Sequence, residues 1–311
     1  MASLYVVSKP DPFAEQLAEQ LGAQYEPMST YKTYPSGHES KQVFSDPDML
    51  KQRPVLFVNR GRTPFDSNMV FTETNVVTGK LHDEYKSMVW TFLPGFPYAR
   101  EDKGFERGCV VARRRIIEDL QRYCEMLFAV GEHGSRREDY VRENFFNFSP
   151  VPSVVEFVRG LSLKDAVALA PDGTANDDVL EIAGALGTAS DVFYKRRDTA
   201  TGAVTVNGTL PDLQGRDLLI YDDMIGMGGT LEKAVTRGKE SGAGKIVAVV
   251  GLDMSGVDGK GRVAYQAIQD MGVEIYATDA VDSPIARISI VPHVAEQLRT
   301  RFLRRLARQN P

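Results

Sequence analysis

The sequence contains little cysteine, no long apolar run and no excess of positive charge. Its two cysteines, Cys109 and Cys124, match neither a disulfide framework nor a metal-binding spacing, so we expect reduced thiols in a cytoplasmic protein. No apolar run approaches the roughly 20 residues that a membrane helix needs, so no membrane partner is expected. The net charge of −5 provides no basic surface for nucleic acid.

The length and composition are those of a globular protein with about two domains. Hydrophobic residues make up 42% and charged residues 25% of the 311 positions, as in ordinary globular chains. A proline-rich stretch at 148–153 is typical of a linker. We therefore expect an N-terminal domain over 1–150 and a C-terminal domain over 151–311, with the last helix able to pack back on the first domain.

Strand and helix patterns alternate along both halves. Strands are expected at 4–7, 54–59, 91–98, 126–130, 166–170, 191–194, 218–221, 246–252, 274–278 and 288–291. Helices are expected at 12–21, 83–90, 110–123, 154–161, 176–186, 261–271 and from 292 onward. The polar stretches 24–40, 131–150 and 195–211 are expected to be irregular. The alternation predicts an α/β fold of two similar domains, each a mostly parallel sheet flanked by helices.

The stretch 217–231 carries the clearest site pattern. An apolar strand over 218–221 is expected to end at the adjacent carboxylates Asp222 and Asp223. A small-residue turn and a helix N-cap follow: Gly226, Met227, Gly228, Gly229 and Thr230. Backbone N–H groups at a helix start favour an anion, and paired carboxylates can hold vicinal hydroxyls or magnesium. The pattern therefore predicts a sugar-phosphate site; the alternative is an acidic turn without a ligand.

Two charged segments also follow expected strands. Lys195, Arg196 and Arg197 could clamp a polyphosphate and stabilise charge on a group in transfer, although a solvated charge run is the plainer interpretation. Arg100 could meet a nucleotide phosphate, or the charges at 100–103 could form a surface ion-pair cluster.

His133 and Asp172 are weaker candidates at strand ends. His133 follows the strand at 126–130 and could contact magnesium-associated water or a phosphate. Asp172 follows the strand at 166–170 in a similar position. Most single loop histidines have no such role, so neither residue predicts a metal site alone.

Taken in order, these segments resemble one family. The stretch 217–231 resembles the PRPP-binding signature of type I phosphoribosyltransferases. Over nearly the whole chain, the likeness is to the phosphoribosyl pyrophosphate synthetases. The segment 98–103 resembles that family's ATP-binding stretch, 130–133 resembles its Val-Asp-Leu-His, and 170–173 resembles its Ser-Pro-Asp-Ala. Residues 195–197 match the start of its catalytic loop, and 34–39 resembles the loop that reaches a neighbouring subunit's adenine.

The resemblance implies a type I phosphoribosyltransferase-like fold and transfer of the β,γ-diphosphate of ATP to the anomeric hydroxyl of ribose 5-phosphate. The implied products are PRPP and AMP, the implied cofactor is Mg²⁺, and an intersubunit ATP site implies a homo-oligomer. The implied catalytic residues are Lys195 and Arg197, and the implied metal contacts are His133 and Asp172. The implied ATP-binding residues are Arg100, Glu101, Asp102, Arg107, His133, Tyr34 and Ser36. Asp222, Asp223 and the residues from Gly226 to Thr230 would bind the ribose phosphate.

The loop after the acidic pair departs from the family pattern. The family has Asp-Thr where this chain has Gly226 and Met227, so an acidic side chain and a hydroxyl are missing. Losing the hydroxyl weakens a phosphate contact by on the order of 1–2 kcal/mol. Either the phosphate site is weaker, or the acceptor extends beyond its 5-phosphate, as ADP-ribose does. Arg136, Arg137 and Arg142 could meet the extra phosphate.

Two other functions remain open from the sequence. A non-catalytic regulatory subunit would lack the cations of the catalytic loop, but Lys195, Arg196 and Arg197 are present. A phosphoribosyltransferase that consumes PRPP needs only the stretch 217–231, whereas the duplicated domain and the segment around Arg100 favour an ATP-dependent enzyme.

Overall fold

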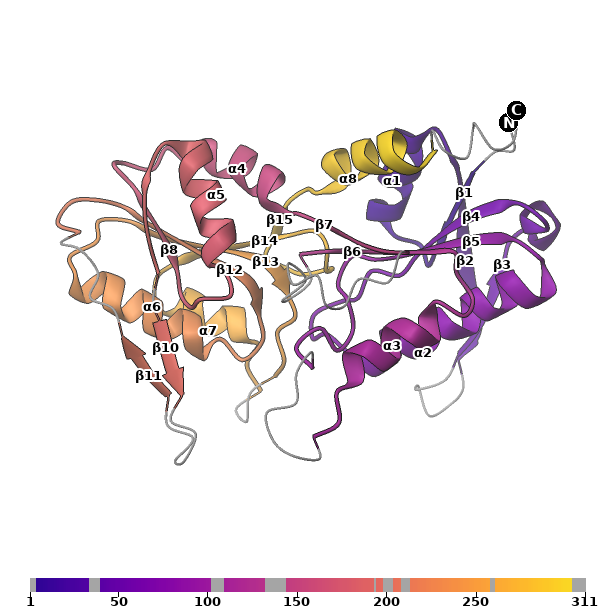
Figure 1. The fold of residues 1–311 in the computed structure, drawn as a ribbon, viewed down its shortest axis with the longest axis horizontal. Helices are drawn as coiled ribbons and strands as arrows, with labels where there is room; N and C mark the ends of the chain where they lie inside the picture. Colours follow the sequence, from indigo (N-terminus) through magenta and orange to yellow (C-terminus); the bar gives the residue numbers. More distant parts are fainter. Residues whose placement is uncertain are drawn as a thin grey trace. The chain divides into compact units, whose positions relative to one another are not determined.

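The computed structural model describes residues 4–33, 40–101, 109–131, 144–192, 194–197, 204–207, 213–257 and 261–303, with the backbone alone at 30–33, 40–42, 194–197 and 204–207. The chain divides into two compact units (Figure 1). Unit 1 comprises Met1–Gly61, Asp66–Phe148 and Ile290–Pro311, and unit 2 comprises Arg62–Phe65 and Ser149–Ser289. Both units therefore draw on segments that are far apart in the sequence.

Unit 1 is built on a seven-stranded sheet in the order β3-β2-β1-β4-β5-β6-β7. The strands are β1 (Tyr5–Ser8), β2 (Gln24–Thr33), β3 (Ser40–Phe44), β4 (Pro54–Val58), β5 (Met88–Leu93), β6 (Met126–Val130) and β7 (Phe145–Phe148). All pairs are parallel except β2 with β3. Helices α1 (Pro12–Leu21) and α8 (Val291–Gln297) cover one face, and α2 (Ser67–Gly79) and α3 (Ala112–Leu120) cover the other (Figure 1). The short turns are η1 (Pro47–Leu50), η2 (Lys80–Glu84) and η4 (Leu298–Leu303).

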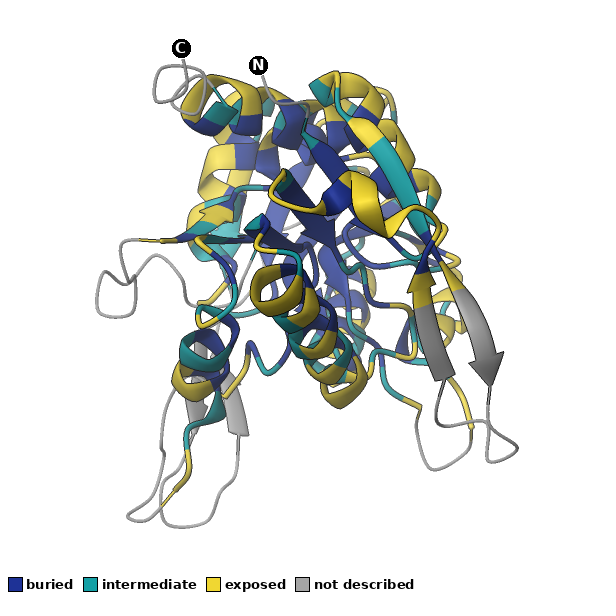
Figure 2. Ribbon diagram, turned by 90° about the vertical axis from the view of Figure 1, so that its right-hand side faces the viewer, coloured by how far each residue is buried: buried dark blue, intermediate teal, exposed yellow. Residues whose placement is uncertain are grey.

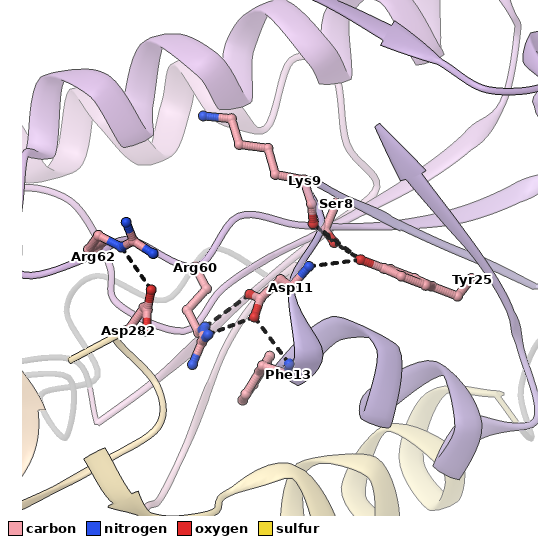
Figure 3. A network of polar contacts seen from close by, with 8 residues as sticks. All are labelled: Ser8, Lys9, Asp11, Phe13, Tyr25, Arg60, Arg62 and Asp282. Carbon is pink, nitrogen blue, oxygen red and sulfur yellow. Dashed lines mark hydrogen bonds and ion pairs between the residues drawn. The ribbon is translucent and has the colours of Figure 1, made fainter. Parts of the chain in front are cut away.

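The start of α1 shows how local sequence sets an element boundary. Asp11 is the N-cap, and its Oδ1 accepts a hydrogen bond from the backbone N–H of Phe13 at 3.1 Å. The same carboxylate is bound by Arg60, whose Nε lies 2.9 Å from Oδ2 and whose Nη2 lies 2.6 Å from Oδ1. Figure 3 shows Asp11 between this guanidinium and the helix start. The helix ends at Gly22, whose φ of 65° suits glycine.

Unit 2 is built on a six-stranded parallel sheet in the order β15-β14-β13-β12-β8-β9. The strands are β8 (Val167–Ala170), β9 (Ala189–Val192), β12 (Leu218–Ile225), β13 (Ile246–Asp253), β14 (Glu274–Thr278) and β15 (Ala286–Ile288). Helices α4 (Val151–Arg159) and α5 (Asn176–Leu186) lie on one face, and α6 (Gly229–Glu240) and α7 (Ala264–Asp270) lie on the other (Figure 1). A separate antiparallel ribbon joins β10 (Tyr194–Arg197) and β11 (Val204–Asn207).

The core of unit 2 lies on both faces of its sheet. Every residue of β12 and β13 is buried, as expected for central strands of a parallel sheet. Leu219 and Tyr221 pack in the cluster with α4 and α5, whereas Leu218 and Ile220 pack in the cluster with α6 and α7. In unit 1, which faces the viewer in Figure 2, buried strands likewise lie beneath helices whose outer faces are exposed.

The expected fold class is confirmed, and several expected elements lie where predicted. Strands β6 and β14 and helix α5 have the predicted residues. None of the described helices has the length and apolar character needed to span a membrane.

Some local predictions were wrong. In the stretch expected to be irregular at 24–40, residues 24–33 form β2 and residue 40 begins β3, and 145–148 forms β7 instead of a loop. The helix expected over 83–90 is wrong, because η2 ends at Glu84 and β5 starts at Met88. Lys195 and Arg197 lie in the β10–β11 ribbon and not in an irregular loop. Strand β7 has only four residues, and a segment that short gives little periodicity to read.

Candidate active site

The strand order of unit 2 identifies the part of the sheet where a ligand is expected. From β8 the chain passes through α5 to β9, and from β12 it passes through α6 to β13 on the other side. The direction in which successive strands are added to the sheet therefore reverses between β8 and β12, and α5 and α6 lie on opposite faces (Figure 1). In open α/β sheets, ligands bind beyond the carboxyl ends of the strands at such a switch point.

The acidic pair lies at this point, but inside the strand. Asp222 and Asp223 were expected to follow the strand, whereas β12 continues to Ile225. Strand pairing, such as that of Asp222 with Val250 in β13, therefore fixes their backbone. The two residues are 7% and 8% exposed. A buried, rigidly held pair of carboxylates suits a ligand that brings hydroxyl groups or a cation.

Backbone N–H groups orient both carboxylates. The N–H of Asp223 donates to Oδ1 of Asp222 at 3.1 Å, and the N–H of Met224 donates to Oδ1 of Asp223 at 2.7 Å. Each bond engages one oxygen of its carboxylate and limits side-chain rotation, which pre-organises the pair for a bound ligand.

Tyr221, which the sequence analysis missed, lies directly before the acidic pair. It is 1% exposed, and its hydroxyl donates a hydrogen bond to Oδ2 of Asp178 at 3.4 Å. Burial raises the pKa of Tyr221 well above its usual value, and the carboxylates of Asp178, Asp223 and Asp222 raise it further. The hydroxyl therefore stays protonated and remains a donor at neutral pH. The sequence signal that could have identified Tyr221 is its hydroxyl group at the end of the apolar run 218–221.

Gly251 on β13 is a second residue that sequence reasoning missed. A Cβ at this position would lie 2.6 Å from the carbonyl oxygen of Asp223 and 3.2 Å from the hydroxyl of Tyr221. Any side chain would displace the backbone that carries the acidic pair. A glycine inside an apolar strand often marks such a close approach, and that pattern was visible at 246–252.

The glycine-rich loop leads into α6 and forms the start of that helix. The N-cap is Gly228, with φ 80°, and not Thr230, which is the second residue of the helix. Gly229 is exposed, with no neighbouring atom within 4 Å of a Cβ built on it. The first-turn N–H groups of a helix lack intrahelical acceptors, so this start can bind an anion such as a phosphate.

Apolar surface lies beside this loop. Met227 is 61% exposed, and its sulfur lies 3.4 Å from a Cβ built on Gly256. The N–H of Gly256 donates to the carbonyl of Gly226 at 3.3 Å, which ties the two loops together. Val257, the next residue, is 49% exposed. The loop therefore presents a thioether and an isopropyl group in place of polar side chains.

Asp172 reaches the same edge of the sheet from β8. Leu169 pairs with Ile220, so the residues after β8 continue alongside the acidic pair. Asp172 is half-buried, and its Oδ1 accepts a hydrogen bond from the N–H of Thr174 at 2.9 Å. The structure thus brings together three of the predicted residues, Asp172, Asp222 and Asp223, at the switch point.

The remaining predicted residues are only partly placed. Arg100 and Glu101 are exposed in the segment after β5, at the carboxyl edge of the unit 1 sheet. Lys195 pairs with Val206 and Arg197 with Val204 through the backbone, and their side chains lie outside the description. Eight other predicted residues lie outside the described ranges, namely Tyr34, Ser36, Asp102, Arg107, His133, Arg136, Arg137 and Arg142.

The switch point of unit 1 differs in one respect. It lies between β1 and β4, and the residues beyond these strands include Asp11 and Arg60. These two side chains bind each other, and they are 14% and 10% exposed. Because these two charges neutralise each other, this pair is poorly suited to bind an anion.

Comparisons with known proteins address the family to which this chain belongs. No family model matches the chain. Over 206 residues it is 30% identical to ribose-phosphate pyrophosphokinase 2 of Archaeoglobus fulgidus. The aligned region covers 66% of this chain and 73% of that relative. The chain belongs to the ribose-phosphate pyrophosphokinase family. The family expected from the motifs, the PRPP synthetases, is thereby confirmed.

Two further matches extend the likeness over nearly the full length. The ribose-phosphate pyrophosphokinase of Methanopyrus kandleri is 26% identical over 282 residues, covering 90% of this chain and 93% of that protein. The solved structure of phosphoribosylpyrophosphate synthetase from Mycobacterium smegmatis has a TM-score of 0.80 at 20% identity, over 97% of this chain and 99% of that one. The ribose-phosphate pyrophosphokinase fold therefore spans both units.

Proposed function

We propose that this protein is an ATP-dependent diphosphokinase that transfers the β,γ-diphosphate of ATP to the anomeric hydroxyl of a ribose 5-phosphate moiety. With ribose 5-phosphate as acceptor, the products are PRPP and AMP, a reaction of nucleotide biosynthesis. Membership of the ribose-phosphate pyrophosphokinase family supports this reaction. The observation that carries it is the buried pair Asp222 and Asp223 at the switch point, beside the exposed helix start at Gly229.

Each part of the site has a role in this proposal. Asp222 and Asp223 accept hydrogen bonds from the vicinal ribose hydroxyls, and the start of α6 binds the 5-phosphate. The ribose is thereby oriented with its anomeric oxygen towards the donor. That oxygen attacks the β-phosphorus, its proton passes to solvent, and the bond from the β-phosphorus to the α,β-bridging oxygen breaks. AMP leaves with the bonding electron pair.

No covalent enzyme intermediate is needed. Positioning and charge stabilisation can carry phosphoryl-type transfer. We assign Lys195 and Arg197 to neutralise the moving diphosphate, and Arg100 and Glu101 to ATP binding, together with Asp102, Arg107, His133, Tyr34 and Ser36. Changing Lys195 to Ala is expected to abolish turnover while the circular dichroism spectrum stays that of the wild type. Unchanged turnover would remove the assigned role.

Mg²⁺ is the proposed cofactor, and the residues present fit it. The described residues contain no group of three or more metal-binding side chains. Magnesium, however, is usually held by one or two carboxylates together with substrate phosphates and water. Asp172 and the acidic pair supply such carboxylates, and His133 is assigned a contact. When bound, the ion would neutralise charge on the phosphate oxygens.

The acidic pair allows a direct test. Changing Asp222 or Asp223 to Asn replaces a charged carboxylate acceptor with a neutral amide. The change should lower kcat/KM for the acceptor substrate by about 10- to 100-fold, because hydrogen bonds to charged groups contribute roughly 1.5–3 kcal/mol each. Asp270 at the end of α7 is a control, because its side chain is 67% exposed. Wild-type kinetics in both site variants would overturn the ribose-binding role.

A second acceptor class is favoured by one observation. Beside the helix start, Met227 and Val257 present exposed apolar surface, and Gly229 leaves open space. This arrangement suits an acceptor that continues beyond its 5-phosphate, with ADP-ribose as the leading example. Its ribose 5-phosphate end also has an anomeric hydroxyl. Diphosphate transfer would then give ADP-ribose pyrophosphate, a reaction connected with NAD metabolism.

Substrate assays distinguish these possibilities. The protein is incubated with ATP and Mg²⁺ alone, with ribose 5-phosphate or with ADP-ribose, and the products are resolved by mass spectrometry. The expected result is AMP together with a product about 160 mass units heavier than the acceptor, because the transfer adds two HPO₃ groups of about 80 mass units each. Equal AMP release without acceptor contradicts both versions. No product with either acceptor would favour a regulatory subunit, and pyrophosphate release from PRPP with nucleobases would favour a phosphoribosyltransferase.

The loop itself can be exchanged to test the acceptor. The double change Gly226→Asp and Met227→Thr restores the family residues at both positions. If the acceptor is ADP-ribose, this variant should use ADP-ribose less well and ribose 5-phosphate better. If the acceptor is ribose 5-phosphate, the double variant should have a lower KM for ribose 5-phosphate and no other kinetic change. We also propose a cytoplasmic homo-oligomer with ATP sites between subunits, and light scattering after size-exclusion chromatography gives its mass.

A further inference from the structure

Tyr98 follows β5 in a backbone conformation that its side chain disfavours. Its φ is 58°, in the left-handed region where residues with a Cβ are strained. Such outliers persist only where neighbouring contacts hold them, and they occur often at functional sites. The conformation turns the chain sharply, because Ala99 is 2% exposed while Arg100 and Glu101 are exposed.

The first two residues of α2 hold Tyr98 in this conformation. Its backbone N–H donates to Oγ of Ser67 at 3.3 Å, and its hydroxyl donates a short hydrogen bond to Oδ1 of Asn68. The helix start is itself fixed, since the N-cap Asp66 accepts from the N–H of Met69 at 3.0 Å. Tyr98 is therefore held by both its main chain and its side chain.

The other end of the turn is tied to α3. The N–H of Glu101 donates to the carbonyl of Tyr98 at 3.0 Å, and the N–H of Arg113 donates to the carbonyl of Glu101 at 3.3 Å. Arg100 thus lies between two fastened points. The segment that carries Arg100 is held between the starts of α2 and α3, although Arg100 itself is exposed.

We propose that Tyr98 is a positioning residue that presents Arg100 and Glu101 to ATP. The role rests on the proposed function, which places ATP at these two residues. The strain at Tyr98 and its hydrogen bonds to α2 form a brace that fixes the direction of the segment. Tyr98 itself does not touch the reacting atoms.

The chain offers a matched control on the same strand. Lys86 precedes β5, has φ 55° and is exposed, so it has the same backbone conformation at the opposite end of β5. Glycine fits this region at both positions. If positive φ alone matters, Tyr98→Gly and Lys86→Gly will behave alike. If Tyr98 acts as a brace, only Tyr98→Gly will impair ATP binding.

The experiment measures steady-state kinetics and the affinity for a non-hydrolysable ATP analogue. Tyr98→Phe and Tyr98→Gly should raise KM for ATP about five- to tenfold, the loss of roughly one hydrogen bond, with KM for the acceptor within twofold. Asn68→Ala should reproduce Tyr98→Phe, and the double variant should be no worse than either single one, because both remove one bond. Lys86→Gly should match the wild type.

The outcomes separate the two hypotheses. A wild-type KM for ATP in Tyr98→Phe and Tyr98→Gly overturns the positioning role while the proposed function stands. Equal increases in KM for both substrates, with a lowered Tm, indicate a general structural role and overturn it as well. If the wild type turns over no acceptor, the proposed function fails, and the analogue affinities still decide the role of Tyr98. A wild type that does not bind the analogue overturns both.

Discussion

The hydroxyl of Tyr221 donates a hydrogen bond to Oδ2 of Asp178 at 3.4 Å and so joins β12 to the first turn of α5. Strand β12 carries the acidic pair, and α5 begins directly after the loop that contains Asp172. One side-chain contact therefore links the two segments that form the switch-point site.

Changing Tyr221 to Phe keeps the buried ring and removes this contact. The free energy of unfolding should fall by about 0.5–1.5 kcal/mol, the usual net contribution of a hydrogen bond. Urea unfolding followed by circular dichroism measures the change. Asp178→Asn retains an acceptor and should lose less than Asp178→Ala, and a Tyr221→Phe variant as stable as the wild type would show that the 3.4 Å contact contributes nothing.

Gly251 should not tolerate a methyl group. Because its Cβ would lie 2.6 Å from the carbonyl oxygen of Asp223, Gly251→Ala should cost about 1–3 kcal/mol, as overpacking typically does, and also lower activity. Gly184 in α5 is the matched control, since it is exposed with no atom within 4 Å of a Cβ built on it. Gly184→Ala should stabilise the protein by roughly 0.5–1 kcal/mol. Thermal unfolding and kinetics of both variants test the pair.

Arg60 and Arg62 form ion pairs of very different burial. Arg60 and Asp11 are 10% and 14% exposed, whereas Arg62 and Asp282 are 77% and 40% exposed (Figure 3). Arg60→Ala leaves Asp11 nearly buried without this cation and should cost about 3 kcal/mol. Arg62→Ala should cost less than about 1 kcal/mol. Chemical denaturation of the two variants measures both values, and equal losses would contradict the burial argument.

The two thiols should differ in reactivity. Burial raises the pKa of the Cys124 thiol to about 11, from an ordinary value of 9.0, whereas Cys109 is exposed. Iodoacetamide at pH 8 should label Cys109 in the native protein and Cys124 only after unfolding, as peptide mass spectrometry can show. Labelling of native Cys124 at the rate of Cys109 would contradict its burial.

The same shift gives a pH dependence with a definite sign. The Cys124 thiol is neutral when protonated, and the fold disfavours its thiolate. Its contribution to stability is therefore complete below pH 9 and is lost as the pH rises from 9 towards 11. Cys124→Ala, compared with the wild type across this window, should show a smaller alkaline loss in the free energy of unfolding.

The sequence predicted the elements whose apolar pattern is strong and the site whose residues are contiguous. Helix α5 and strands β6 and β14 were predicted residue by residue. Helix α2 was missed, because its β-branched valines and threonines resemble a strand. The acidic pair was identified, although β12 continues through it, because carboxylates are rare inside a buried strand and were taken as its end.

The supporting residues of the site could not be predicted, because their roles depend on contacts distant in the sequence. Tyr221 meets Asp178 across 43 positions, and Gly251 lies against Asp223 from the neighbouring strand. No periodicity encodes either relationship. The backbone conformation of Tyr98 is likewise set by α2, a helix that the sequence analysis did not predict.

The return of the C-terminal segment to unit 1 imposes an order on synthesis. Phe302 packs against Phe128 and Phe146, with ring centroids 5.0 Å and 4.6 Å apart. A chain growing on the ribosome has made residues 128 and 146 long before residue 302, so until then these rings lack their contact with Phe302. Meanwhile 149–289 is synthesised in full, and the unit 2 sheet can form first. The half of the protein that is translated earlier is thus the half that is completed last.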